Sequence, residues 1–471
     1  MAVSAGMGVV VAAGAAAAAG PWQGGQRTAE RNFAAARDAE AGPGGKPKAK
    51  PSPVSTAVSP AGPGGISTAV PSAAPVLLPV GGSAAPLPAG LSAELARTLD
   101  PLLTAYGMGP VRTGAVIDVS SGSVLFDHQD GTATTPASTT KLATATAALG
   151  LLGPEKRLTT RVVATGTTGK GDVVLVGGGD PTLELGQLAE DTAKALKAAG
   201  RTKIALGYDT SLYSGPTLHP IGHNENLAPV TALMADEGRL DGSSSGPASR
   251  AWDPAASAAG DFAQLLGKQG ITVTAVTHEH AGTAGNVAGT TLATHVSAPL
   301  ADLVERMLTN SDNDLAEALA RQSAIASGRP ASFAGGAAAI RAALVRYGVP
   351  LPRASFHDGS GLDHDDRLAP VTLARLLALA ASPEHAELRS ILTGVPVADF
   401  TGTLAARFHG SPAAGLVHAK TGTLTGTNTI AGTVVTAGGR LLAFSFMTQG
   451  GYDPVATEQA LDALATAVAG A

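Results

Sequence analysis

The chain has 471 residues, of which 44% are hydrophobic and 15% charged, so most of it should fold, and its length predicts more than one compact unit. Its net charge of -5 is spread along the chain without a long basic run, which excludes nucleic acid as a partner. There is no cysteine, which excludes a thiol nucleophile, a disulfide framework and any thiolate metal site.

Residues 1–20 carry no charge and consist mainly of Ala, Gly and Val, which is typical of an export signal. No basic residue precedes this apolar run, whereas Arg27, Arg31 and Arg37 follow it. For an uncleaved anchor, this distribution would direct the rest of the chain towards the cytoplasm. We expect a signal peptide or membrane anchor here, with the remainder secreted or membrane-associated outside the cytoplasm. Residues 21–90, rich in Pro, Gly and Ala, predict a linker.

The folded region is predicted to begin near Leu91 with a short amphipathic helix. Strands at 112–120 and 122–127 follow, joined as a hairpin at Ser120-Ser121-Gly122. The next helix has Ser138 at its N-terminus and ends near Gly150.

The hydrophobic pattern up to about residue 292 predicts an α+β unit, with strands at 173–176, 203–207 and 271–276 and helices at 185–199 and 255–269. Helices are then expected at 299–308, 313–326, 333–347 and 370–381. The chain ends with strands at 415–424, 427–436 and 440–448 and a helix at 453–469. Early and late strands together predict one sheet assembled from both ends of the chain, so that the middle is an insertion.

Ser138-Thr139-Thr140-Lys141 is an S-x-x-K pattern, which places a hydroxyl and an amine on the same face of a helix. A serine hydroxyl is a poor nucleophile until a neighbouring base takes its proton, and a lysine can be that base only if its pKa is lowered. The helix N-terminus would also favour an oxyanion near Ser138. Taken alone, the pattern fits a serine helix cap with a solvated lysine better.

Ser311-Asp312-Asn313 falls between two predicted helices. Such a triplet by itself most often caps a helix. In a cleft, however, the Ser311 hydroxyl could relay protons, and the Asn313 amide could form a hydrogen bond with a substrate amide.

Lys420-Thr421-Gly422-Thr423 lies in an apolar, strand-like run. A K-T-G triplet alone would usually mark a solvated strand end. On an edge strand, Gly422 would instead allow an extended peptide to pair closely with the backbone. Lys420, Thr421 and Thr423 could then hold a carboxylate.

The three patterns occur in the order S-x-x-K, S-D-N, K-T-G, on a helix, an inter-helix loop and a late strand. This set resembles the active-site pattern of penicillin-binding proteins and serine β-lactamases. The resemblance covers residues 91–471 and implies an α+β transpeptidase fold, in which an antiparallel sheet of N- and C-terminal strands packs with helices.

The interval between Ser138 and Ser311 is long enough for an inserted domain. The chain therefore resembles the D-alanyl-D-alanine carboxypeptidase/endopeptidases of peptidase family S13, which are low-molecular-mass class C penicillin-binding proteins of type 4. Further segments carry this resemblance, at 177–183, 227–233, 297–300 and 358–362. It implies a catalytic domain at 91–159 and 293–471 and one inserted α+β domain at 160–292, although family members commonly carry two inserts.

The resemblance also implies roles for single residues. Ser138 would be the acylated nucleophile and Lys141 its general base, and Ser311 with Lys420 would relay a proton to the leaving D-alanine. Substrate would be bound by Asn313, Thr421, Gly422 and Thr423, with the backbone N–H groups of Ser138 and Thr423 as the oxyanion hole. The implied partners are peptidoglycan stem peptides and β-lactam antibiotics, with no metal and no cofactor. The sequence indicates no particular oligomeric state.

Two other functions stay open at this point. A serine β-lactamase would use the same triplets, but no E-x-x-L-N pattern lies between Asn313 and Lys420 to supply a deacylating Glu. A catalytically silent peptidoglycan-binding protein would keep the fold, although its usual mark is the loss of a motif residue. The densest polar cluster, His357-Asp358 with residues 363–366, is expected to be a solvated loop, because its spacing matches no metal-ligand pattern.

Overall fold

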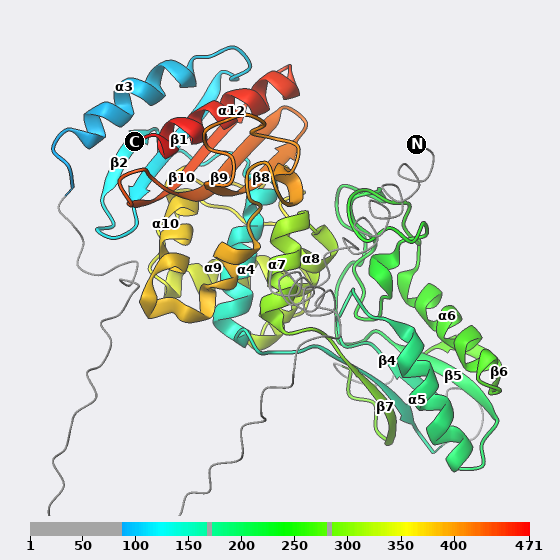
Figure 1. The fold of residues 1–471 in the computed structure, drawn as a ribbon. Coiled ribbons are helices and arrows are strands. Elements are labelled where there is room, and N and C mark those ends of the chain that lie inside the picture. The colour runs from blue at the N-terminus through cyan, green and yellow to red at the C-terminus, as the bar shows by residue number, and fades with distance from the viewer. Residues whose placement is uncertain (1–86, 167–171, 280–284) are drawn as a thin grey trace, which may run out of the picture. The chain divides into compact units, whose positions relative to one another are not determined.

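The computed structural model describes residues 87–166, 172–279 and 285–471 (Figure 1). The predicted signal or anchor at 1–20 and the predicted linker up to residue 86 lie outside the described residues. In the part of the chain that is described, no helix combines the length and the apolar character needed to cross a membrane.

Antiparallel strands from the two ends of the chain form the first sheet, in the order β2-β1-β10-β9-β8 (Figure 1). They are β1 (Val111–Asp118), β2 (Val124–His128), β8 (Val417–Leu424), β9 (Thr427–Val435) and β10 (Leu441–Gln449). β1 joins the N-terminal hairpin to the C-terminal strands, with Ala115 opposite Ser445 of β10. The predicted assembly from both ends of the chain is confirmed, and β8, which carries K-T-G, is an edge strand.

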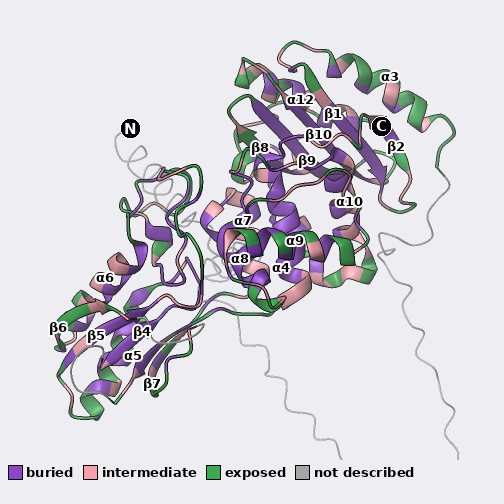
Figure 2. Ribbon diagram, turned by 180° about the vertical axis from the view of Figure 1, so that it is seen from behind, coloured by how far each residue is buried: buried purple, intermediate pink, exposed green. Residues whose placement is uncertain are grey.

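Both faces of the first sheet are covered, and β9 and β10 are therefore almost entirely buried (Figure 2). On one face, α3 (Leu91–Leu103) and α12 (Pro454–Ala469) share a hydrophobic cluster with Phe444 and Phe446. On the other face, Ala443 and Met447 belong to a cluster formed with the central helices. This alternation along β10 follows from the two-residue period of a strand.

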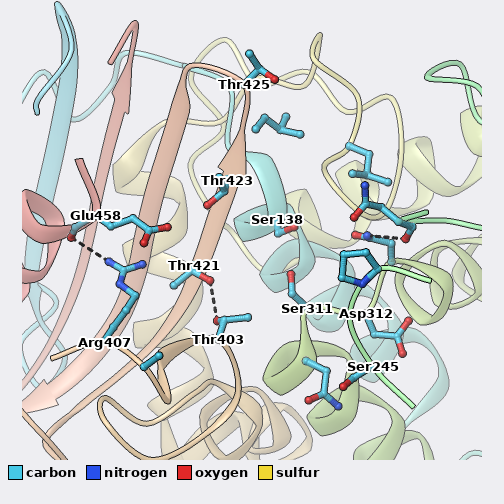
Figure 3. A pocket seen from close by; sticks show the side chains of 18 of the residues that line it. Ser138, Ser245, Ser311, Asp312, Thr403, Arg407, Thr421, Thr423, Thr425 and Glu458 are labelled. Carbon is cyan, nitrogen blue, oxygen red and sulfur yellow. Dashed lines mark hydrogen bonds between the residues drawn. The ribbon is translucent and has the colours of Figure 1, made fainter. Parts of the chain in front are cut away.

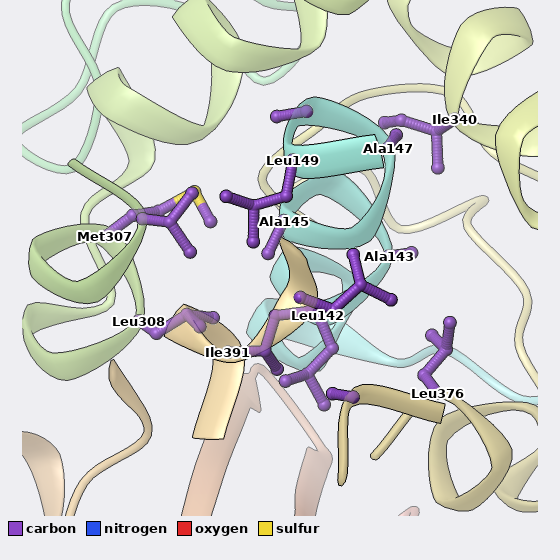
Figure 4. Packing of buried hydrophobic residues seen from close by; sticks show 14 of the residues in the cluster. Leu142, Ala143, Ala145, Ala147, Leu149, Met307, Leu308, Ile340, Leu376 and Ile391 are labelled. Carbon is purple, nitrogen blue, oxygen red and sulfur yellow. The ribbon is translucent and has the colours of Figure 1, made fainter. Parts of the chain in front are cut away.

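The central helices are α4 (Thr140–Leu152), α7 (Leu300–Asn310), α8 (Asn313–Ala326), α9 (Phe333–Arg346), α10 (Pro370–Ala381) and α11 (Ser390–Gly394). α4 lies in the middle of them, and every residue from Thr140 to Leu149 is buried (Figure 4). A helix covered on all sides has no polar stripe, and its many alanines let neighbouring helices approach closely. Leu142 and Leu149 share a cluster with Met307 of α7, and each buried leucine contributes about 1.5–3 kcal/mol.

The second sheet has the order β6-β5-β4-β3-β7. Its strands are β3 (Thr159–Ala164), β4 (Val173–Val176), β5 (Lys203–Asp209), β6 (Thr272–His278) and β7 (Thr290–Val296). β5 runs parallel to β4 and β6, whereas β3 is antiparallel to β4 and β7. The helices α5 (Leu185–Ala198) and α6 (Pro254–Lys268) form a hydrophobic cluster with this sheet.

β3 and β7 were not among the strands expected from the sequence. β7 is rich in threonine and largely exposed, with only Ala293 buried, so it lacks the apolar run that marks a buried strand. This sheet extends from Thr159 to Val296, slightly beyond the expected insertion at 160–292. The domain boundaries themselves stay a prediction.

Candidate active site

Ser138 lies on a single 3₁₀ turn, η1 (Ala137–Thr139), immediately before α4. Ala137 has a φ of 50°, a left-handed conformation that a non-glycine residue rarely adopts. Several contacts hold this turn. The Pro136 carbonyl accepts hydrogen bonds from the hydroxyls of Thr139 (2.6 Å) and Thr429 (2.9 Å).

The Ser138 hydroxyl is directed at Lys141. Lys141 Nζ lies 3.1 Å from Ser138 Oγ, as the three-residue spacing predicts. The alternative of a serine helix cap is wrong, because Thr139 occupies the N-cap position of α4 and no side chain caps this end. The alternative of a solvated lysine is also wrong, because Lys141 is fully buried.

Lys141 has two further hydrogen-bond partners. Its Nζ donates to Asn313 Oδ1 at 2.6 Å and to the Ser360 carbonyl at 2.7 Å. A neutral amine has two N–H groups and one lone pair, so these two acceptors can engage both N–H groups and leave the lone pair facing Ser138 Oγ. Burial lowers the pKa of Lys141 to about 8, although the Asp358 and Glu317 carboxylates oppose this change.

The S-D-N triplet forms the turn between α7 and α8. Ser311 ends α7 with a left-handed φ of 56°. Asp312 is the N-cap of α8 and accepts a hydrogen bond from the Leu315 N–H at 2.9 Å, so the capping alternative holds for this one residue. Asn313 reaches Lys141 and donates from Nδ2 to the Asn226 carbonyl at 2.9 Å.

Buried ion pairs brace this turn from the chain segment before α6. Arg250 pairs with Asp314 at 3.0 Å, and Arg306 of α7 pairs with Asp312 at 3.5 Å and with Glu237. Burial raises the pKa of Glu237 to about 9 and that of Asp314 to about 7. Arg306 and Arg250 oppose these increases in pKa, so the arginines offset only part of the cost of burying the two carboxylates.

The K-T-G triplet lies on β8, and Lys420 is fully buried, so the alternative of a solvated strand end is wrong. Lys420 Nζ donates to the Thr421 carbonyl at 2.8 Å. Burial, and then the charge of Lys141, hold the pKa of Lys420 well below its ordinary value. A Cβ atom at Gly422 would lie 2.8 Å from the Pro136 carbonyl, so only glycine lets β8 approach the turn before Ser138.

An open cleft of about 730 Å³ lies in front of these groups. Figure 3 shows Ser138 and Ser311 on one side of it and Thr421 and Thr423 of β8 on the other. Asn313 also lines the cleft, whereas Lys141 and Lys420 are buried beneath it. Among the described residues, no hydrogen bond links Ser311 Oγ to Ser138 or to Lys420.

Thr403 was missed by the sequence reasoning. It lines the same cleft, and its Oγ1 lies 2.7 Å from Thr421 Oγ1 (Figure 3). The residue precedes β8 by a long loop, and no pattern in the sequence links it to the K-T-G triplet.

The expected solvated loop is confirmed only in part. His357, His364 and Asp365 are exposed, whereas Asp358 and Asp366 are completely buried. Asp358 accepts hydrogen bonds from the N–H groups of Gly361 (2.7 Å) and Asp363 (2.8 Å) and lies 3.0 Å from His219 Nε2. These local bonds replace water, which is how a charged loop can be buried. In the sequence, only the family resemblance of residues 358–362 indicated that this loop belongs to the site.

Two clusters in the described residues bring ionisable side chains within metal-binding distance, namely His219, Glu317 and Asp358, and Glu237, Asp312 and Asp314. In the first, backbone N–H groups occupy both Asp358 oxygens and one Glu317 oxygen. In the second, arginines supply the positive charge. Apart from Glu317 Oε2, which has no hydrogen-bond partner among the described residues, the carboxylate oxygens of both clusters are engaged in hydrogen bonds or ion pairs of the protein itself.

A family sequence model and individual relatives both show similarity between this chain and D-Ala-D-Ala carboxypeptidases. The sequence model of the D-Ala-D-Ala carboxypeptidase 3 (S13) family matches residues 95–248 and 241–469. A carboxypeptidase of Mycobacterium tuberculosis is 35% identical over 413 residues, which cover 83% of this chain and 86% of that protein. Carboxypeptidase DacB of Mycolicibacterium smegmatis is 36% identical over 374 residues, covering 75% of this chain and 79% of that protein.

Among solved structures, penicillin-binding protein 4 of Haemophilus influenzae superposes with a TM-score of 0.67 and 23% identity, covering 81% of this chain and 99% of that chain. This likeness shows a shared fold and confirms the predicted fold class.

Proposed function

The chain belongs to the D-Ala-D-Ala carboxypeptidase 3 (S13) family and is a serine-type D-Ala-D-Ala carboxypeptidase, and we propose that its acyl-enzyme forms on Ser138. The observation that carries the proposal is the 3.1 Å contact between Ser138 Oγ and the buried amine of Lys141. The proposed substrate is a peptidoglycan stem peptide ending in D-alanyl-D-alanine.

Lys141 acts as the general base in this proposal. With a pKa of about 8, roughly one molecule in ten carries the neutral amine at pH 7. The Ser138 hydroxyl gives its proton to this amine while Oγ attacks the carbonyl carbon of the penultimate D-alanine. The backbone N–H groups of Ser138 and Thr423 stabilise the oxyanion that forms.

Ser311 and Lys420 return a proton to the leaving group. As the peptide bond breaks, the nitrogen of the terminal D-alanine needs a proton to depart as a free amine. The lowered pKa of Lys420 supports its part in this relay, because a lysine with a lowered pKa gives up its proton more readily than an ordinary lysine. Water then attacks the ester carbonyl, the proton it loses is taken up by the same groups, and Ser138 is released.

The edge strand β8 binds the substrate backbone by extending the sheet. Thr421 and Thr423 line the cleft beside Ser138 and hold the terminal carboxylate. The Thr403 hydroxyl forms a hydrogen bond with the Thr421 hydroxyl. The amide group of Asn313 lines the opposite wall and binds the substrate amide. Cross-link cleavage passes through the same acyl-enzyme, so the proposed activity includes both carboxypeptidase and endopeptidase reactions.

β-Lactams are proposed to acylate Ser138 and to remain bound. The resemblance to the family is the basis for this inhibitor class and for action outside the cytoplasm, in the cell-wall space. A β-lactamase is the alternative, and it predicts rapid release of the hydrolysed drug instead.

The test uses the tripeptide diacetyl-L-lysyl-D-alanyl-D-alanine and measures free D-alanine. Ser138→Ala should abolish release, whereas Ser257→Ala on α6, which is not among the residues that line the cleft, should leave it unchanged. Intact mass after incubation with penicillin should give one stable adduct in the wild type and none in Ser138→Ala. Unchanged D-alanine release by Ser138→Ala, or rapid penicillin turnover, would contradict the proposal.

A further inference from the structure

Glu317 is a fully buried carboxylate that has no role in the chemistry proposed above. It lies on α8, one helical turn after Asn313, and therefore faces the same side of the helix. Its Oε1 accepts hydrogen bonds from the N–H groups of Gly359 at 3.0 Å and Ser360 at 2.8 Å. Its Oε2 is buried and has no hydrogen-bond partner among the described residues.

These bonds connect Glu317 to the general base through one residue. Ser360 donates its N–H to Glu317 and offers its carbonyl to Lys141 Nζ at 2.7 Å. The next residue, Gly361, has a φ of +81°, and a Cβ atom there would lie 2.0 Å from the Ala137 carbonyl. The loop that contains Ser360 and Gly361 is thus fixed between α8 on one side and the turn before Ser138 on the other.

We propose that Glu317 is a positioning residue that holds the Ser360 carbonyl against Lys141, and whose negative charge, together with that of Asp358, raises the pH at which Lys141 can act as a base. The inference rests on the proposed function of Ser138 and Lys141 and adds a residue to it that touches neither substrate nor nucleophile.

The charged groups around Glu317 come from several elements. Asp358 and His219 lie beside it in one buried cluster, Arg321 is one turn further along α8, and Lys141 faces it from α4. Burial, and then the Asp358 charge, raise the pKa of Glu317 to about 7, against the opposing influence of His219 and Arg321. The raised pKa of Glu317 and the lowered pKa of Lys141 bring the titrations of the two groups close together, so the charge of each affects the other.

The direction in which Glu317 shifts the protonation of Lys141 follows from its charge. An anionic carboxylate favours the lysine ammonium, which cannot accept the Ser138 proton. Removing that charge should stabilise the neutral amine, so that the base becomes available at lower pH. Removing the hydrogen-bond acceptor should instead release the Ser360 carbonyl and slow the reaction at every pH.

The experiment compares two variants by the second-order rate of acylation by a fluorescent penicillin between pH 5 and pH 10. Glu317→Gln keeps an oxygen that can accept both N–H bonds but has no charge. The midpoint of its pH–rate profile should shift down by about one pH unit. Its limiting acylation rate at high pH should stay within a few-fold of the wild-type rate. Glu317→Ala lacks the acceptor, and its limiting rate should fall by at least about tenfold.

Rates are divided by the fraction of molecules that penicillin finally labels, so that unfolded protein does not contribute. Glu190→Gln removes a charge from an exposed position on α5 and should leave the midpoint unchanged. A Glu317→Gln midpoint equal to that of the wild type would overturn the inference. If the wild type itself is not acylated, the proposed function fails instead, and the two failures are thereby distinguished.

Discussion

Asn313→Asp should shift the pH dependence of acylation to higher pH. Asn313 Oδ1 lies 2.6 Å from Lys141 Nζ, so the substitution places a carboxylate in contact with the general base. At this separation and an effective dielectric constant of about 20, Coulomb's law gives an attraction of about 6 kcal/mol. The cost of burying a new charge beside the anionic Asp312 cancels part of it.

A net increase of about 2 in the pKa of Lys141, equivalent to about 3 kcal/mol, is the magnitude we expect. With the pKa raised from about 8, the neutral fraction at pH 7 would fall by about 100-fold. The same loss is expected in the rate of acylation. The rate should recover about tenfold for each pH unit until about pH 10, because the variant needs only to lose the lysine proton.

The assay is stopped-flow acylation by a fluorescent penicillin from pH 6 to pH 10. Asn313→Ala is the matched control, because it removes the amide without adding charge and should not raise the midpoint. A loss that is uniform across this pH range in Asn313→Asp would refute the reasoning, since it would indicate disturbed geometry rather than a stabilised ammonium.

Two further predictions concern stability. Gly361→Ala forces a Cβ to within 2.0 Å of the Ala137 carbonyl at a φ of +81°, so the free energy of unfolding in urea should fall by at least about 2 kcal/mol. Gly260→Ala in α6, where a Cβ meets nothing within 4 Å, should not lower the free energy of unfolding. Equal losses of stability in the two variants would contradict this account. Burial alone would raise the pKa of Asp118, but hydrogen bonds from Arg440 and the following turn lower it to about 2. Its folded pKa lies below the unfolded one, so Asp118 contributes about 2 kcal/mol above pH 4 that is lost as the pH falls to 2. The difference in unfolding free energy between wild type and Asp118→Asn should shrink over that range, and a difference that stays constant with pH would exclude this role.

Local sequence determined much of the fold. The predicted helices at 313–326 and 370–381 agree with α8 and α10 residue for residue, because apolar periodicity, caps and breakers act over a few neighbouring positions. The contact between Ser138 and Lys141 is also local, since the two residues are three positions apart, across the junction of η1 and α4. The strand β7 escaped prediction because it is mostly exposed and rich in threonine, and its pairing with the distant β3 makes it a strand.

What the sequence determined for the site is the set of reactive groups and their order along the chain. Tertiary structure alone decided what surrounds Lys141. Asn313 from α8 and Ser360 from a distant loop supply its acceptors, and complete burial lowers its pKa. Composition predicts a solvated loop at 357–366, but its segment 358–362 is buried, because Glu317 and Asp358 accept hydrogen bonds from its backbone N–H groups. Spacing within a helix can bring a hydroxyl and an amine together, but only packing from other segments removes the water that would keep that amine protonated.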